Sequence, residues 1–453
     1  MTWDSQSLMR KIFGTDGIRS QVNHDPMTPS LILRVGQAAA LIFARNNHKR
    51  HKVIIAKDTR ISGYVFEYAL TSGLCSMGVD VYQVGPMPTP ALAHLVKSFA
   101  ADAGIMITAS HNPIEDNGIK FFSHDGYKLQ DEIEEEIEKL LEKPIELTTP
   151  VERLGRAFKI EDARGRYIEF VKHSIKNRSL KGYKIVLDCA NGAAYKVAPL
   201  IFQELGADVI VLGNIPNGLN INNSGSQHPE MMQQAVKQHN ADVGIALDGD
   251  GDRVVMADEQ GVLIDGDILL AIAAVHLKNK AKLDKDTVVT TVMANSGFDE
   301  AMNQHGITVV RTEVGDRYVV EEMHKNGYTL GGEQAGHIVF GKHATTGDGT
   351  LSALQILSIM HQEKKPLSEL AKVMLVYPQV TLNFPVKEKK PLDTMPKVQA
   401  AIQNAEKEIK GRVLVRYSGT QNMCRIMIEG KSKEHITKSA EEIAKIIKEE
   451  LGA

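Results

Sequence analysis

The sequence predicts an α/β fold: three similar α/β domains with mixed sheets, followed by a smaller C-terminal α+β domain. Strand-like segments alternate with helix-like segments through most of the chain, a pattern that is typical of mostly parallel sheets. One strand sequence also recurs, because Ala101–Ile105 (ADAGI) is echoed by Ala241–Ile245 (ADVGI). After residue 370 the order of strands and helices changes, which predicts a last domain of another type.

The first domain is expected over residues 1–155. It opens on a turn in which Gly14 and Gly17 bracket a Thr-Asp pair, so that Arg19 is aimed from a fixed place; a plain surface turn with a solvated arginine is the alternative. The acidic run Gln130–Glu142 predicts a solvated helix face that leads out of this domain. The elements between them are expected to be a core helix at Pro29–Ala44, a buried strand at Val53–Ala56, a helix ending at Leu74, and strands at Gly78–Gly85 and Ala101–Thr108.

The second and third domains are expected over residues 156–255 and 256–370. The strand Val53–Asp58 has a counterpart in Lys184–Asp188 and a looser one in Thr287–Thr291, so the three domains read as variations on one module. In open α/β sheets ligands gather at the carboxyl ends of the strands. We therefore expect the chemistry of this protein in the loops that follow these strands.

The last domain, residues 371–453, carries a different pattern. Its expected elements are a strand at Val376–Val386, a helix at Thr394–Ile409, strands at Arg412–Arg416 and Cys424–Glu429, and an amphipathic helix at Lys433–Leu451.

Composition narrows the class of protein. The 453 residues are 43% hydrophobic and 24% charged, which is near the average for globular proteins. A net charge of −3 with scattered lysines gives no reason to expect a nucleic acid partner. The apolar stretch around Ile268–His276 is too short to span a membrane, and Met1–Arg10 lacks the apolar core of a signal peptide. Three widely spaced cysteines (Cys75, Cys189 and Cys424) predict reduced thiols, so we expect a cytoplasmic protein.

The loop Thr108–Pro113 (TASHNP) presents one serine, Ser110, directly before His111. An apolar strand runs into this loop, and the proline prevents regular structure from continuing. Ser110 could be a nucleophile, a phosphorylated residue or only a turn-former. Downstream, the turn at Asn117-Gly118 brings the amine of Lys120 back toward the loop.

The most specific stretch is Leu247–Arg253 (LDGDGDR), which places Asp248, Asp250 and Asp252 on alternate positions with glycines between them. Such carboxylates can fold around one hard cation, because glycine permits close turns. A calcium loop of the EF-hand type is disfavoured, since Arg253 and a strand intervene before its twelfth position at Glu259. A solvated acidic turn is another alternative. A catalytic Mg²⁺ with open coordination positions fits best, and Arg253 would offset phosphate charge beside it.

Two further loops complete the set. In Gly331–His337 (GGEQAGH), Glu333 can accept hydrogen bonds from paired sugar hydroxyls and His337 can donate or accept near neutral pH. A phosphate cradle is indicated by Arg416, Ser418, Gly419, Thr420 and, on the next strand, Arg425. A glycine-rich turn and a hairpin with exposed arginines are the respective alternatives. Together the four loops suit a sugar phosphate that is held by its phosphate while another position meets the metal and the serine.

At this point the chain resembles the α-D-phosphohexomutase superfamily, and within it the bacterial phosphoglucosamine mutases, over essentially its whole length. The motifs that carry the resemblance are Thr108–Pro113, Asp248–Arg253 and Gly332–His337, with Phe13–Arg19, Thr345–Gly349 and Val314–Tyr318 favouring the glucosamine branch over the phosphomannomutases. The resemblance implies four domains around a central cleft. It also implies a homodimer and a place on the route to UDP-N-acetylglucosamine for cell-wall synthesis.

The resemblance further implies a phosphorylated Ser110 that converts glucosamine 6-phosphate into glucosamine 1-phosphate through glucosamine 1,6-bisphosphate, which also serves as activator. By the same resemblance one Mg²⁺ is bound by the three aspartates and a phosphoserine oxygen. Arg19, His111, Lys120 and Arg253 would surround the transferring group, with Lys120 or His111 moving the proton. Glu333, Ala335 and His337 would bind the sugar, and the Arg416–Arg425 cradle would bind the distal phosphate.

Some positions depart from the family pattern. Ala335 stands where serine is usual, and a lost hydrogen bond there would cost about 0.5–1.5 kcal/mol. The loop around residues 417–422 is also altered, which affects the shape of the phosphate cradle. These departures support one alternative, an inactive sugar-phosphate-binding protein. A phosphomannomutase or phosphoglucomutase is another, because the loops are shared within the superfamily, and a metallophosphatase is a third.

Overall fold

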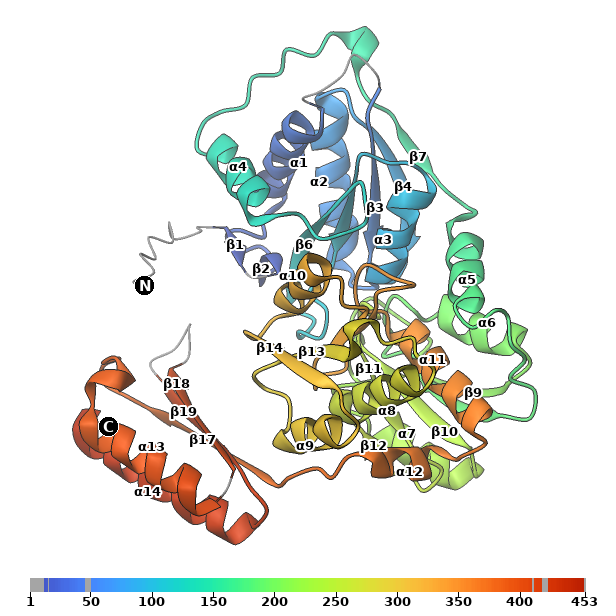
Figure 1. Ribbon diagram of the computed structural model, residues 1–453. Helices are drawn as coiled ribbons and strands as arrows, with labels where there is room; N and C mark the ends of the chain where they lie inside the picture. The colour runs from blue at the N-terminus through green and yellow to red at the C-terminus, as the bar shows by residue number, and fades with distance from the viewer. Residues whose placement is uncertain (1–11, 15, 45–49, 410, 418–422, 452–453) are drawn as a thin grey trace. The chain divides into compact units, whose positions relative to one another are not determined.

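The computed structural model describes residues 12–14, 16–44, 50–409, 411–417 and 423–451 (Figure 1). The chain forms two compact units. Residues up to Met293 and Ile307–Lys372 make the first unit, and Ala294–Gly306 with residues from Val373 onward make the second.

The first domain is organised by a mixed sheet in the order β1-β2-β6-β5-β3-β4-β7. Its strands are β1 (Phe13–Gly14), β2 (Gly17–Gln21), β3 (Lys52–Lys57), β4 (Asp80–Pro86), β5 (Ala103–Ile107), β6 (Asp116–Ser123) and β7 (Ala157–Lys159). Its helices are α1 (Pro29–Phe43), α2 (Ser62–Ser76), α3 (Thr89–Ser98) and α4 (Asp131–Leu141).

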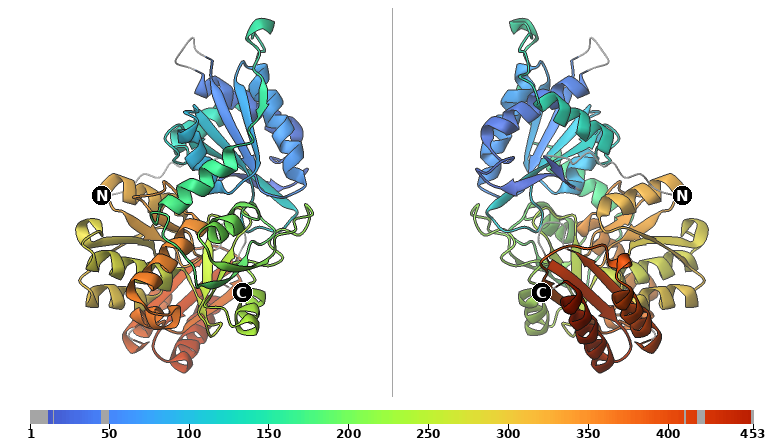
Figure 2. Two further views of the ribbon diagram at one scale, coloured as in Figure 1. Left: turned by 90° about the vertical axis from the view of Figure 1, so that its right-hand side faces the viewer. Right: turned by 90° about the vertical axis from the view of Figure 1, so that its left-hand side faces the viewer.

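Helices cover both faces of this sheet (Figures 1 and 2). Successive side chains of a strand point to opposite faces. Accordingly, Ala103 and Ile105 of β5 pack in the core that contains α1, α2 and α4, whereas Gly104 between them lies against Leu92 and Val96 of α3. Strand β5 is apolar and buried at every position, because both of its faces are covered.

The second domain has a sheet in the order β12-β11-β10-β8-β9, and the third has β14-β13-β15-β16. The strands of the second are β8 (Lys184–Asp188), β9 (Asp208–Leu212), β10 (Val243–Leu247), β11 (Val254–Ala257) and β12 (Leu263–Ile264), with helices α5 (Ala163–His173), α6 (Val197–Glu204) and α7 (Glu230–His239). The third has β13 (Thr287–Thr291), β14 (Thr308–Thr312), β15 (Leu330–Gly332) and β16 (Ile338–Phe340), with α8 (Gly266–Asn279), α10 (Asp316–Asn326), α11 (Gly349–Glu363) and α12 (Leu367–Leu370).

The three sheets share one arrangement. Each contains two adjacent parallel strands, β3 with β5, β8 with β10 and β13 with β15, and a third parallel strand on the outer side of the first. In each sheet the chain then leaves the second strand through a loop and returns on an antiparallel strand: β6, β11 or β16. The predicted repeat is therefore confirmed, since Ala101–Ile105 and Ala241–Ile245 run into equivalent strands. The loops after β5, β10 and β15 carry three of the four candidate site motifs.

The second unit contains the predicted α+β domain. Its sheet has the order β17-β19-β18 and is antiparallel. The elements are β17 (Gln379–Pro385), α13 (Pro396–Ile409), β18 (Arg412–Tyr417), β19 (Met423–Glu429) and α14 (Lys433–Leu451), together with α9 (Ser296–Gln304). Glu429 is buried and accepts hydrogen bonds from the backbone nitrogen of Ser296 at 3.1 Å and from its hydroxyl at 2.6 Å, which ties α9 to the strands.

The acidic helix α4 differs from the prediction of a solvated face. Glu134 is buried and accepts a hydrogen bond from Arg317 Nη2 at 3.0 Å, and the same nitrogen donates to the Leu129 carbonyl at 2.9 Å. Arg317 comes from α10 of the third domain, so the glutamate supports an interdomain contact. Spacing along one helix could not reveal a partner from another domain.

Reduced cysteines and the absence of a membrane-spanning segment are both expected from composition. Cys75, Cys189 and Cys424 are free thiols. Among the described residues, no helix is both long enough and apolar enough to cross a membrane.

Helices α1 and α2 approach closely because each carries a glycine at the crossing. A Cβ atom on Gly73 would lie 2.2 Å from the Leu33 carbonyl oxygen, and one on Gly36 would lie 2.9 Å from that of Leu70. Both obstacles are backbone atoms, so they cannot rotate away as a side chain could. The two glycines therefore set the distance between these helices.

We expect Gly73→Ala to destabilise the protein, because α1 and α2 must separate to admit the methyl group. The expected loss is about 1–3 kcal/mol, the usual cost of overpacking. Gly165→Ala on α5 is the matched control, since a Cβ there meets nothing within 4 Å. It should stabilise by about 0.5–1 kcal/mol through helix propensity. Urea unfolding of both variants measures the difference; equal stability would contradict the role of Gly73.

Candidate active site

Ser110 lies in the loop between β5 and β6 in a strained backbone conformation. Its φ of 49° is in the left-handed region, where residues other than glycine are uncommon. The hydroxyl donates a hydrogen bond to Asp248 Oδ2 at 2.7 Å and lies 3.3 Å from His111 Nδ1. The backbone nitrogen donates to Thr108 Oγ1 at 2.8 Å. Such strain persists only where surrounding structure holds it.

The buried guanidinium of Arg60 provides that support. Its Nη2 donates to the carbonyls of Ser110 at 3.0 Å and Asn112 at 2.8 Å, and its Nη1 donates to the carbonyl of Pro113. Asp58 Oδ2 balances the charge at 3.0 Å from Arg60 Nε. From the second domain, Asn222 Nδ2 donates to the same Ser110 carbonyl at 2.8 Å. The serine is thus held through its backbone by groups from two domains.

The loop between β10 and β11 brings three buried carboxylates together. One oxygen from each of Asp248, Asp250 and Asp252 lies within 4.8 Å of the others. Within the part of the chain that the structure describes, Asp250 Oδ1 and Asp252 Oδ1 have no hydrogen-bond partner although both are buried. Buried carboxylate oxygens without partners are costly, and a divalent cation is the usual compensation. The residues present therefore fit a Mg²⁺-type ion.

The carboxylates also repel one another. Burial raises the pKa of Asp248 well above its usual value, and the charges of Asp250 and Asp252 add to the shift. Burial and Asp250 raise the pKa of Asp252 to about 6. Burial would raise the pKa of Asp250 as well, but Lys120 and Thr89 outweigh it and hold that pKa low. Burial and mutual repulsion therefore disfavour the ionised forms of Asp248 and Asp252, and a bound cation would offset that penalty.

Gly249 allows this loop to reach the serine. A Cβ atom at Gly249 would lie 2.7 Å from the Ser110 carbonyl oxygen and 2.9 Å from the Asn222 amide. Any larger residue would push the aspartates away from the serine hydroxyl. The glycine between the first two aspartates therefore has a steric role as well as a conformational one.

Basic side chains surround the serine and the aspartates. Lys120 Nζ lies 3.0 Å from Asp16 Oδ2, 3.1 Å from Asp250 Oδ2 and 3.8 Å from Asp252 Oδ2. Burial would lower the pKa of Lys120, but these three carboxylates raise it above its usual value, so the amine stays charged. Arg19 donates to Asn112 Oδ1 at 3.2 Å and to Asp16 Oδ2 at 3.0 Å.

Arg253 and His111 are the other two basic side chains predicted around the transferring group. Burial would lower the pKa of Arg253, but Asp252, Asp248 and Glu333 raise it, so the guanidinium is charged. Burial lowers the pKa of His111, and the charges of Arg253 and Arg19 lower it further, to about 4. The imidazole of His111 is therefore neutral at pH 7.

The loop between β15 and β16 carries the motif Gly331–His337 and is called the sugar loop here. Its backbone is joined to the start of β11, directly after the aspartate loop, because Val254 N donates to the Gly336 carbonyl at 3.0 Å. Glu333 is largely buried. His337 is only 1% exposed, and its Nε2 accepts a hydrogen bond from Gly347 N at 3.1 Å. Ala335 offers no side-chain hydrogen bond, as expected from its chemistry.

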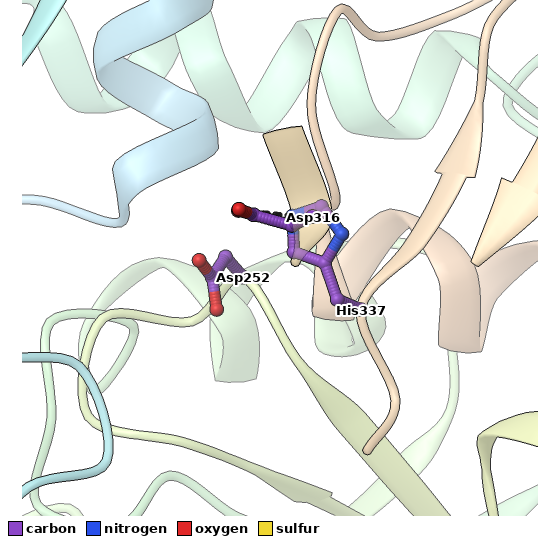
Figure 3. Close-up of side chains that lie close together, drawn as sticks. All are labelled: Asp252, Asp316 and His337. Atoms are coloured by element: carbon purple, nitrogen blue, oxygen red, sulfur yellow. Dashed lines mark ion pairs between the residues drawn. The ribbon is translucent and has the colours of Figure 1, made fainter. Parts of the chain in front are cut away.

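Asp316 joins this group from the first turn of α10. Figure 3 shows Asp252, Asp316 and His337 lying close together, each from a different element of the second and third domains. Asp316 Oδ2 is 3.4 Å from His337 Nε2 and contacts the ammonium of Lys128, which also binds Asp16 Oδ1. Asp316 and Lys128 therefore connect the third domain to the first across the site.

The predicted phosphate cradle is described in part. Ser418, Gly419 and Thr420 lie outside the described residues. Arg416 of β18 and Arg425 of β19 are directly paired across the antiparallel strands. Like charges opposite each other on a sheet repel. An anion between or beside them would relieve this repulsion, which is consistent with a phosphate site.

Sequence reasoning missed several residues of the site. Arg60 and Asp58 carried a usable signal, because they follow the end of a buried strand and ligands gather at such ends. Asp16 was visible only as part of a turn. Asn222 and Lys128 carried no local signal, since each acts on residues of another domain.

Comparisons with known proteins identify relatives of the whole chain. The sequence matches four family descriptions: "Phosphoglucomutase/phosphomannomutase, alpha/beta/alpha domain I" over residues 10–147, domain II over 165–261, domain III over 265–377 and the C-terminal domain over 382–446. It is 54% identical to phosphoglucosamine mutases from Pelobacter propionicus and Geobacter metallireducens over 450 residues. These alignments cover 98% of this chain and 99–100% of theirs.

Solved structures with low identity share the fold. A phosphoglucomutase/phosphomannomutase family protein from Burkholderia thailandensis superposes with a TM-score of 0.77 at 22% identity, covering 97% of both chains. An N-acetylphosphoglucosamine mutase from Aspergillus fumigatus, in complex with GlcNAc-6P and magnesium, gives a TM-score of 0.67 at 18% identity, covering 97% of this chain and 96% of that one.

We expect Mg²⁺ to raise the melting temperature of the protein, because the ion offsets repulsion among the buried aspartates. At 100 times the dissociation constant, binding to the folded state adds about 2.7 kcal/mol. Asp252→Asn should abolish most of the Mg²⁺ effect and should be more stable than wild type in EDTA. Asp162→Asn, at an exposed position, is the control and should respond like wild type. A wild-type protein that is indifferent to Mg²⁺ would contradict the metal site.

Proposed function

This chain belongs to the phosphoglucomutase/phosphomannomutase family, and we propose that it passes a phosphoryl group between Ser110 and the two ends of glucosamine phosphate. It is an enzyme of the phosphoglucosamine mutase type, which interconverts glucosamine 6-phosphate and glucosamine 1-phosphate. Full-length relatives of that name at 52–54% identity support this substrate. The observation that carries the proposal is the Ser110 hydroxyl, held 2.7 Å from Asp248 in a three-aspartate cluster.

The cycle needs a phosphorylated Ser110. In the first transfer the Oγ–P bond breaks as the O1 hydroxyl of glucosamine 6-phosphate attacks phosphorus, and the hydroxyl proton passes to a base. Glucosamine 1,6-bisphosphate then reorients. In the second transfer the O6–P bond breaks, Ser110 Oγ takes the phosphoryl group back, and O6 regains a proton. Glucosamine 1-phosphate leaves, and no net water is consumed.

Asp248, Asp250 and Asp252, with a phosphoserine oxygen, would hold the Mg²⁺ ion. When bound, the ion supplies positive charge to the oxygens of the transferring phosphoryl group. The strained loop supports this arrangement, because Arg60 and Asn222 fix the backbone of Ser110 while its side chain faces the aspartates.

Fixed positive charge is the second requirement of phosphoryl transfer, since the transition state spreads negative charge over the phosphoryl oxygens. Arg19, Lys120 and Arg253 would supply it. For proton transfer, His111 is favoured over Lys120. Its imidazole is neutral and lies 3.3 Å from the Ser110 hydroxyl, whereas Lys120 is kept charged by the carboxylates around it.

Glu333 would bind sugar hydroxyls, and His337 would hold the shape of the loop from its buried position. With Ala335 in the loop, one contact to the sugar would be made by water or by none. Arg416 and Arg425, with the Ser418–Thr420 segment, would bind the distal phosphate. Its hydroxyls and backbone amides would add to the charge of the arginines.

Four further features stay predictions. They are the domain joins near residues 155, 255 and 370, a homodimer, a cytoplasmic location, and activation by glucosamine 1,6-bisphosphate.

We expect purified protein incubated with glucosamine 1,6-bisphosphate and Mg²⁺ to gain one phosphate, which peptide mapping places on Ser110. Glucosamine 6-phosphate should remove it without release of inorganic phosphate, whereas a metallophosphatase would release it. Ser110→Ala should gain no phosphate and lose activity by at least about 10³-fold, since its oxygen is the acceptor in the cycle. A Ser110 that stays unmodified under all conditions would refute the mechanism.

Sugar preference is measured separately by comparing kcat/KM for glucosamine 6-phosphate with that for glucose 6-phosphate and mannose 6-phosphate. We expect glucosamine 6-phosphate to be preferred. A preference for mannose or glucose would assign the chain to another branch of the same family while leaving the phosphoserine mechanism intact.

A further inference from the structure

A glucosamine phosphate differs from the corresponding glucose phosphate at C2, where an ammonium group replaces a hydroxyl. An ammonium carries three N–H donors and no acceptor. A site that prefers the amino sugar must therefore offer an acceptor at this position, and a carboxylate is the strongest one available. Each carboxylate around Ser110 can be considered in turn.

Most of these carboxylates already have a use. The three aspartates of the β10–β11 loop face the serine and the candidate metal position. Asp16 is paired with Arg19 at 3.0 Å and Lys120 at 3.0 Å, and it also binds Lys128. Asp58 is buried against Arg60 beneath the serine loop. Among the described residues, two carboxylates of the third domain are the candidates with fewer cationic partners: Glu333 of the sugar loop and Asp316 of α10, which is paired with Lys128.

Asp316 already binds a primary ammonium group, because its Oδ2 contacts Lys128 Nζ. Its other oxygen, Oδ1, accepts a hydrogen bond from Arg317 N at 2.7 Å, which fixes the orientation of the carboxylate. The side chain is 13% exposed, so it is neither sealed in the core nor freely hydrated. A carboxylate oriented in this way is suited to a second N–H donor from a ligand.

Asp316 is also well placed relative to Glu333. Asp316 Oδ2 lies 3.4 Å from Nε2 of His337, and the backbone nitrogen of Glu333 donates to the His337 carbonyl at 2.9 Å, so His337 contacts both residues. In a pyranose, the C2 substituent is next to the C3 hydroxyl. A sugar whose hydroxyls bind Glu333 would thus place its C2 group near this loop, where Asp316 offers a carboxylate.

From these contacts we propose that Asp316 accepts the C2 ammonium group of the sugar and so selects glucosamine phosphates over glucose and mannose phosphates. The inference rests on the proposed function. It also gives a physical reason for the Val314–Tyr318 motif, in which Asp316 lies between Gly315 and Arg317. Gly315 has a φ of 142°, and it places the carboxylate at the first turn of the helix.

A metal ion is the other occupant to consider, since Asp252, Asp316 and His337 offer ligand atoms within 4.8 Å of one another (Figure 3). Two contacts argue against it. The Nε2 lone pair of His337 is engaged by Gly347 N at 3.1 Å, and Lys128 already compensates the charge of Asp316. Mg²⁺ also requires a near-octahedral oxygen set, which these groups do not provide.

The test compares Asp316→Asn with Asp16→Asn as a matched control, because both carboxylates bind Lys128. We expect Asp316→Asn to lower kcat/KM for glucosamine 6-phosphate by about 10- to 100-fold, the value of a charge-assisted hydrogen bond. Its kcat/KM for glucose 6-phosphate should fall by a factor that is smaller by about 10-fold or more, because the contact with Lys128 is lost for both sugars whereas the sugar ammonium contact is lost for glucosamine alone. Asp16→Asn should lower both values alike, because Asp16 positions the catalytic cations Arg19 and Lys120.

Lys128→Met separates selectivity from a structural role. If Asp316 acted only by holding Lys128, this variant would reproduce the Asp316→Asn pattern. We expect it instead to leave the ratio of the two kcat/KM values within about threefold of wild type, as the Asp316 carboxylate is retained. Melting temperatures show whether each variant is folded, and Asp316→Glu, which keeps the charge, should recover part of the selectivity.

The outcomes distinguish this inference from the function itself. A wild-type enzyme that turns over glucosamine 6-phosphate, with an Asp316→Asn variant that loses activity on both sugars alike, would overturn the role of Asp316 and leave the function standing. A wild-type enzyme without preference for the amino sugar would refute the function first. A Mg²⁺ dependence that disappears in Asp316→Asn would indicate the metal occupant and would also overturn the proposal.

Discussion

The fully buried guanidinium of Arg60 is the interaction on which the site depends. Its N–H groups donate hydrogen bonds to three backbone carbonyls of the serine loop, those of Ser110, Asn112 and Pro113. Asp58 neutralises its charge. Without a partner a buried charge is very costly, so the ion pair and the loop stabilise each other. This support allows Ser110 to keep a left-handed backbone conformation that would otherwise relax. The side chain is thereby directed at the aspartates before any ligand arrives.

The repeated sheet arrangement explains how loops from three domains can serve one site. In each domain the loop follows the second parallel strand and precedes an antiparallel one, so equivalent loops leave equivalent edges. Their meeting then requires small residues: Gly249 lies against the Ser110 carbonyl, and Gly336 lies against the Val254 carbonyl. A single module, used three times with different loops, therefore supplies a phosphoryl acceptor, a metal site and a sugar loop.

Opposite charges in the site are balanced but not fully paired. Lys120, Lys128 and Arg253 are each surrounded by carboxylates, while one oxygen of Asp250 and one of Asp252 find no hydrogen-bond partner among the described residues. Such a site is costly when empty, and a cation together with a phosphate would complete it. The same principle applies to Asp316, whose carboxylate compensates one lysine ammonium and is suited to a second ammonium from the sugar. In both places a charged group of the ligand would compensate a charged group of the protein.

The sequence by itself determined the fold class, the repeat and the three motif loops, because strand periodicity and the chemistry of Ser110, Asp248 and Glu333 are local properties. Only the tertiary structure decided which distant groups support them. Arg60 and Asn222 donate hydrogen bonds to the serine loop, and Glu134 accepts one from Arg317 instead of facing solvent. The sequence does not show these contacts, because they join residues from different elements and domains. Sequence spacing records neighbours along one helix or strand. It does not record the partners that packing brings to a buried charge.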